Sequence, residues 1–110
     1  MTAKRKEETC EAQLRSMCKN IADDISNDSH DGGISGASRW MEGVYNVRYI
    51  VDHEKKYLGA MLMVAGGGPT IWVNTWTKEI EGSWGADRCT HHFRDEVGLD
   101  DYNEEMYNCI

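Results

Sequence analysis

The sequence predicts an α+β fold: a four-stranded antiparallel meander with a long amino-terminal helix on one face and a short carboxyl-terminal helix. Apolar residues recur with a helical period at both ends of the chain and with a period of two through its middle. The connections between the middle segments are short, which favours antiparallel neighbours. The chain has 110 residues, a length typical of one domain, so we expect residues 1–110 to fold as a single unit.

The longest helix is expected over residues 3–26, where neither glycine nor proline occurs. Its apolar residues form one stripe of an α-helix: Cys10, Leu14, Met17, Cys18, Ile21 and Ile25. The helix should end within residues 26–33, where Ser, Asn, Asp and paired Gly favour turns. The following segment, residues 34–43, is ambiguous, although Ser38 is suited to cap a single helical turn.

Four strands are expected, over residues 44–52, 57–65, 70–76 and 79–85. The first alternates in period two and is therefore half-buried. The second is apolar on both faces, as expected of a strand in the middle of a sheet. Helical spacing returns in the tail and predicts a helix over residues 100–108, with Asp101 and Glu104 placed to form a capping box.

The stretch GGGP, residues 66–69, joins the second and third expected strands. A phosphate-binding loop needs converging backbone N–H groups before a helix, usually with a lysine. Pro69 removes one donor, no lysine lies within eight residues, and the following TIWVNTW is β-branched and aromatic. We interpret the stretch as a turn in which glycine supplies positive φ angles and proline begins a strand.

The formal charge is −7, from 12 basic and 19 acidic residues. An acidic surface opposes direct binding to nucleic acid or anionic membranes and suits a basic protein partner. The first residues, MTAKRKEETCEAQL, lack the apolar stretch of a signal peptide, and no run has the length and apolarity of a membrane span. We therefore expect a cytosolic location, in which a disulfide framework would be unusual. Cys10 and Cys18, on one face of the expected helix, should be buried free thiols that behave as small apolar groups.

The segment ADRCTHH, residues 86–92, gathers residue types that bind metals. Alternation along a strand would place Asp87, Cys89 and His91 on one side and His92 on the other. Zinc needs three or four converging ligands, which one short strand does not supply, and the remaining histidines lie in distant loops. A nucleophile and its base normally meet through the fold rather than as near neighbours. We predict no metal site, no cofactor and no catalytic residue.

The acidic tail is the most suggestive feature of the sequence. From residue 95 to residue 110 there are six acidic residues and no basic one: Asp95, Glu96, Asp100, Asp101, Glu104 and Glu105. On a helix the two doublets repeat about every 6 Å, or roughly one charge per 3 Å, close to the ~3.4 Å along one DNA strand. That spacing permits DNA mimicry. Without any partner, the same residues are explained by the helix dipole and by the need for a hydrated surface.

Four tryptophans are many for a chain with a single phenylalanine. If Ile71 and Val73 face the long helix, Trp72 and Trp76 lie on the other face of the sheet, beside methionines of the central strand. The short carboxyl-terminal helix would cover that face only in part. An exposed aromatic face is typical of a protein interface, either in a homodimer or with a foreign target.

Residues 57–87 contain a GGP turn, an aromatic strand ending in NT and a closing hairpin of the form GxWGxD. The matching residues are Gly67, Gly68, Pro69, Trp72, Asn74, Thr75, Gly82, Trp84, Gly85 and Asp87. This stretch, less than a third of the chain, resembles small proteins of phages and mobile elements. Small acidic phage proteins include inhibitors of bacterial immunity, anti-CRISPR proteins among them.

Charge placement and this resemblance predict a phage-type inhibitor without enzymatic activity, acting in the host cytoplasm. Its partner would be a basic host protein that handles nucleic acid, such as a CRISPR effector. The six acidic residues would occupy a surface meant for phosphates, and Trp72 and Trp76 would add desolvated anchors. Two alternatives stay open: a sponge that holds a nucleotide signal near GGGP and the tryptophans, and a structural phage protein without a host target.

Overall fold

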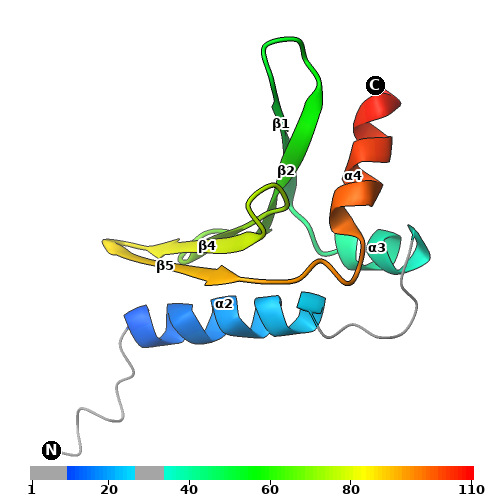
Figure 1. Ribbon diagram of the computed structural model, residues 1–110. Coiled ribbons are helices and arrows are strands. Elements are labelled where there is room, and N and C mark those ends of the chain that lie inside the picture. The colour runs from blue at the N-terminus through cyan, green and yellow to red at the C-terminus, as the bar shows by residue number, and fades with distance from the viewer. Residues whose placement is uncertain (1–9, 27–33) are drawn as a thin grey trace, which may run out of the picture.

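The computed structural model describes residues 10–26 and 34–110 and has an α+β architecture (Figure 1). The described helices are α2 (Cys10–Ser26), α3 (Ile34–Met41) and α4 (Leu99–Asn108). The strands are β1 (Asn46–Val51), β2 (Tyr57–Ala65), β3 (Thr70–Asn74), β4 (Glu79–Trp84) and β5 (Asp87–His92). They lie side by side in chain order, each antiparallel to the next. The amino-terminal helix, the antiparallel sheet and the short carboxyl-terminal helix are confirmed.

The prediction of four strands is wrong, because residues 87–92 form a fifth. After a turn at Gly85 and Ala86, β5 pairs with β4 from Asp87, opposite Trp84, to His92, opposite Glu79. The sequence DRCTHH has no alternating apolar residues, so the period-two signal is missing. Backbone pairing to β4 and the cover that α2 provides make this polar segment a strand.

Helix α2 supplies four of the thirteen buried apolar residues of the core, counted over the described residues. Its buried side chains are spaced four, four and three residues apart: Leu14, Cys18, Ala22 and Ile25. They belong to the same core cluster as fully buried side chains of the sheet: Leu62, Ile71, Val73 and Ile80. Burying one Leu or Ile side chain contributes about 1.5–3 kcal/mol. The apolar stripe expected of this helix is therefore its buried face; the expected start, residues 3–9, lies outside the described part of the chain.

Gly82 sets how closely α2 approaches the sheet. A Cβ atom added to Gly82 would lie 2.7 Å from Cys18 Sγ and 3.0 Å from Leu14 Cδ1. Both distances are shorter than carbon–sulfur or carbon–carbon contact in packed interiors. Helix α2 therefore rests directly on the backbone of β4.

The stretch GGGP connects β2 to β3, as interpreted from the sequence. Gly67 has a φ angle of 95°, which favours glycine. Before this turn the register of β2 with β3 shifts between Met63 and Ala65, and such a bulge bends a strand.

The sheet is bent, and the described helices lie on one side of the bend. In Figure 1 the β1–β2 hairpin stands away from the plane of β4 and β5; α2 lies along β4 and β5, α4 along the hairpin and α3 at the corner. Residues 34–43, ambiguous from the sequence, thus contain the helix that fills this corner. No helix in the described part of the chain is long and apolar enough to cross a membrane.

Candidate protein-binding surface

The first residue of the acidic tail caps helix α4. Gly98 N and Leu99 N donate hydrogen bonds to Asp95 Oδ1 over 2.9 and 2.8 Å, and Asp100 N donates to Asp95 Oδ2 over 2.9 Å. Such N–H groups have no partner inside the helix, and a negative charge is favourable at this end. Because α4 begins at Leu99, this cap replaces the capping box expected further along the helix.

A second acidic residue, Asp100, joins α4 to the sheet. Its Oδ1 accepts hydrogen bonds from the hydroxyl of Thr75 over 2.8 Å and from the hydroxyl of Tyr57 over 2.9 Å. The Thr75 hydroxyl in turn accepts a hydrogen bond from Ala60 N over 2.9 Å. Burial raises the pKa of the Tyr57 phenol; the hydrogen bond with Thr75 opposes this, and Asp100 adds to it. The Asp100 carboxylate is therefore engaged within the protein.

The remaining acidic side chains of the tail are exposed: Glu96, Asp101, Glu104 and Glu105. The last three lie on α4, whose buried residues are Leu99 and Asn103. No ion pair joins them to a cation of residues 10–26 or 34–110. Within the described part of the chain, their charge therefore stays available to a cationic partner.

The two predicted tryptophans differ in environment. Trp72 is half-buried, and the guanidinium carbon of Arg48 lies 4.9 Å from the centre of its ring, a cation–π geometry. Trp76 is 54% exposed, and its backbone N–H donates to Asn74 Oδ1 over 2.9 Å in the β3–β4 turn. Trp76 is thus an exposed indole on a turn whose backbone is hydrogen-bonded in place.

Strand register places Trp72 on a sheet face that the described helices leave open. Met63 is opposite Trp72, and Met61 pairs with Arg48 on one side and Asn74 on the other. The alternate positions of β3, Ile71 and Val73, are buried on the side of α2. Figure 1 shows the three described helices on the same side of the sheet as α2, and none on the side of Trp72. The aromatic and methionine-lined face expected from the sequence is present.

The acidic and aromatic surfaces lie on opposite faces of the sheet. Thr75 and Trp76 are consecutive, but the Thr75 side chain is fully buried, whereas Trp76 is exposed and its Cβ lies 2.5 Å from where a Cβ atom of Gly59 would stand. Thr75 reaches Asp100 on α4, whereas Trp76 follows Trp72 and Asn74 on the open face. A partner that contacts both surfaces has to reach around the β3–β4 turn.

The other residues considered as sites are dispersed. Cys89 lies beside Cys18, with their sulfur atoms 3.1 Å apart. His92 Nε2 lies 3.6 Å from Glu79 Oε2. Among the described residues, no three His, Cys, Asp or Glu side chains come together as a metal site would require; His30 lies outside those residues.

Two features of this region were not predicted from the sequence. One is Arg48, which lies two strands from Trp72 in the sheet order and reaches its ring. Its only sequence signal is that it is the one charged residue of β1, NVRYIV. The other is a tyrosine cluster between α4 and the hairpin, in which the ring centres of Tyr49 and Tyr107 lie 5.2 Å apart. The tail helix is therefore anchored by aromatic packing as well as by Asp100.

Comparison of the chain with protein-family models, with curated proteins and with solved structures finds no match.

Proposed function

We propose that this chain is a non-enzymatic inhibitor that binds a basic, nucleic-acid-handling host protein, such as a CRISPR effector, in the host cytoplasm. The proposal extends the partial resemblance to small phage proteins. The observation that carries it is the row of exposed carboxylates on α4 formed by Asp101, Glu104 and Glu105. These three residues are called the acidic row.

The support for mimicry lies in how firmly the acidic row is held. Asp95 caps the first turn of α4, Asp100 ties it to Thr75 and Tyr57, and the hydroxyl of Tyr107 donates to the Lys55 carbonyl oxygen over 2.6 Å. An array of charges on a helix that is already held in place loses little backbone entropy on binding, which favours affinity. The cationic groove of a nucleic-acid-binding protein is the surface that such an array complements.

The open sheet face supplies a second, separate contact. Trp76 is exposed, and tryptophan is enriched among the residues that dominate binding energy. Because this face is opposite the acidic row, we expect the two surfaces to contribute independently. A variant at Trp76 should weaken binding without changing its dependence on salt.

The test is a matched pair of charge reversals. Asp101→Lys with Glu105→Lys alters the acidic row, and Asp24→Lys with Glu54→Lys changes the net charge equally at exposed positions elsewhere. Asp100 is left intact, since its reversal would also break contacts to β2 and β3. Both variants serve as bait in host lysate, with duplex DNA as competitor and salt raised stepwise.

The proposal predicts capture of a nucleic-acid-binding protein that duplex DNA displaces. The reversal in the acidic row should abolish capture, the control should retain it, and high salt should weaken it about tenfold or more. Undiminished capture by the acidic-row variant, or capture that duplex DNA does not displace, contradicts mimicry. A nucleotide bound to the purified chain in native mass spectrometry would instead favour the sponge.

A further inference from the structure

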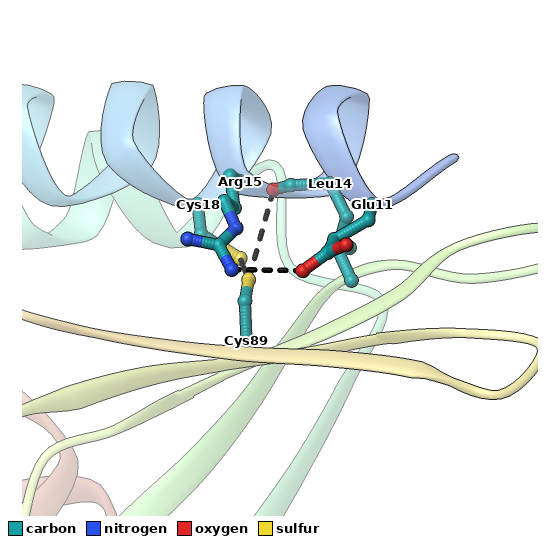
Figure 2. Close-up of polar contacts among 5 residues, drawn as sticks. All are labelled: Glu11, Leu14, Arg15, Cys18 and Cys89. Atoms are coloured by element: carbon teal, nitrogen blue, oxygen red, sulfur yellow. Dashed lines mark hydrogen bonds and ion pairs between the residues drawn. The ribbon is translucent and has the colours of Figure 1, made fainter. Parts of the chain in front are cut away.

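A pair of thiols lies between α2 and the edge of the sheet. Figure 2 shows Cys89 pointing from β5 toward α2, where it meets Cys18, with Arg15 beside both. The sulfur atoms are 3.1 Å apart, and Cys89 Sγ lies 3.8 Å from the Leu14 carbonyl oxygen. A disulfide bond is about 2.05 Å long, so the two sulfur atoms need to approach by only about 1 Å.

The two thiols differ in access to solvent. Cys18 is fully buried over Gly82, whereas Cys89 is half-buried. Burial raises the pKa of Cys18 to about 12, and its hydrogen bond with Cys89 adds to this effect. Cys18 is therefore held as a thiol, and Cys89 is the sulfur that a reagent from solvent meets first.

An open groove of about 410 Å³ leads to Cys89. Its lining residues are Arg15, Ser16, Lys19, Cys89, Thr90 and His91. Two of them are cations, and no carboxylate lines the groove, although the whole chain carries −7. Arg15 and Lys19 do pair with Glu11 and Asp23, each over 2.8 Å. Such exposed i,i+4 pairs are weak, so both cations can turn toward an anionic ligand.

We propose that Cys18 and Cys89 are a redox-active dithiol that an anionic, low-molecular-weight disulfide, of which oxidised glutathione is an example, converts to an intramolecular disulfide between α2 and β5. The proposal is independent of the inhibitor function. The cations of the groove recognise the carboxylates of the small disulfide, and the half-buried sulfur of Cys89 receives it. In a reducing compartment the pair stays as two thiols, and a disulfide there is transient.

The reaction proceeds by two thiol–disulfide exchanges. Cys89 first releases its proton to solvent and attacks one sulfur of the small disulfide. A Cys89–sulfur bond forms, and one small thiolate leaves and takes up a proton. Cys18 then attacks Cys89 Sγ, which forms the protein disulfide and expels the second small thiolate, and the proton of Cys18 passes to that departing thiolate. Two protein thiols are oxidised, and one small disulfide is reduced to two thiols.

The test uses the full chain with Cys10→Ser, so that the remaining thiols are Cys18, Cys89 and the exposed Cys109. After incubation with oxidised glutathione, free thiols are alkylated and the protein is digested and examined by mass spectrometry. We expect a peptide pair cross-linked through Cys18 and Cys89. With Cys18→Ser, a stable glutathione adduct should instead remain on Cys89. Modification of Cys109 alone, without the cross-link or the adduct, overturns the proposal.

A second comparison examines the role of the groove. Arg15→Gln should slow cross-linking by oxidised glutathione about fivefold, and Arg88→Gln, an exposed arginine on the other face of β5, should leave the rate unchanged. A neutral disulfide, hydroxyethyl disulfide, should react with the parent and Arg15→Gln at equal rates. Equal sensitivity of both reagents to Arg15→Gln contradicts recognition of the anion. The measured quantity is the rate of cross-linking in the folded protein. If Arg15 had only a structural role, Arg15→Gln would change this rate equally for both disulfide reagents.

Discussion

The hydroxyl of Thr75 donates a hydrogen bond to Asp100 Oδ1 over 2.8 Å, between the β3–β4 turn and the first turn of α4, 25 positions later in the chain. This contact relates the two surfaces of the protein. Thr75 immediately precedes the exposed Trp76, and Asp100 immediately precedes Asp101 of the acidic row. The aromatic turn and the acidic helix are therefore held by one hydrogen-bonded junction, although they face opposite sides of the sheet.

The junction at Asp100 should be important for stability. Asp100→Ala removes the acceptor of two hydroxyl groups, Thr75 and Tyr57, and we expect a loss of about 1–3 kcal/mol in the free energy of unfolding. Asp101→Ala is the matched control and should change it by less than about 0.5 kcal/mol. Urea denaturation of the three proteins measures both values. Equal losses for the two variants would show that the junction is not stabilising.

The cap at Asp95 should stabilise α4. Asp95→Ala leaves three backbone N–H groups of the first turn without their acceptor, and we expect a loss of about 1–2 kcal/mol. Glu96→Ala, at the next and exposed position, should have little effect. Amide hydrogen exchange at residues 99–103 should accelerate in the first variant and not in the second. Unchanged protection in Asp95→Ala would contradict the role of the cap.

Close packing of α2 on Gly82 should make that position intolerant of a side chain. Gly82→Ala places a Cβ atom 2.7 Å from Cys18 Sγ, and overpacking of this kind costs about 1–3 kcal/mol. Gly43→Ala is the control, because its Cβ would meet only the Trp40 carbonyl oxygen, at 3.9 Å. Adding Cys18→Ala to Gly82→Ala should recover part of the loss. A double variant whose losses simply add would contradict a direct clash.

Stability should fall in alkali, and Tyr57 should contribute to the fall. The pKa of Tyr57 is 10.0 in the unfolded chain and is raised in the folded protein. Burial is the main cause; the hydrogen bond with Thr75 lowers the pKa, and Asp100 raises it further. The unfolded chain therefore loses this proton first. The stabilisation is complete below about pH 10 and is lost as the pH rises above it. Cys18, raised from 9.0 to about 12, adds a decline that begins near pH 9.

The measurement is urea denaturation as a function of pH. The decline above about pH 10 should be shallower in Tyr57→Phe than in the parent, because the titrating group is absent. Tyr45→Phe, which alters a tyrosine that is 74% exposed, should follow the parent curve. A Tyr57→Phe curve parallel to that of the parent would exclude this tyrosine as a cause.

Patterns within single elements carried most of what could be predicted about this fold. The stripe from Leu14 to Ile25 predicted the buried face of α2, and the alternation of Ile71 and Val73 with Trp72 predicted which face of β3 is open. Burial of one face imposes a period of 3.6 residues on a helix and of two on a strand, so these features are local and visible in the chain. The concentration of acidic residues at the carboxyl end is equally visible.

Contacts between distant segments could not be predicted from such patterns. β5 is a strand because its backbone pairs with β4, although its side chains show no apolar period. Asp95 and Asp100 belong to the same acidic tail as Asp101, yet the fold uses the first two internally and leaves the third exposed. The pairing of Cys18 with Cys89 depends likewise on how α2 lies across Gly82. The spacing of apolar residues shows which face of a single helix or strand is buried. The contacts named here depend instead on strand register and on helix placement, which arise only when elements far apart in the chain pack together.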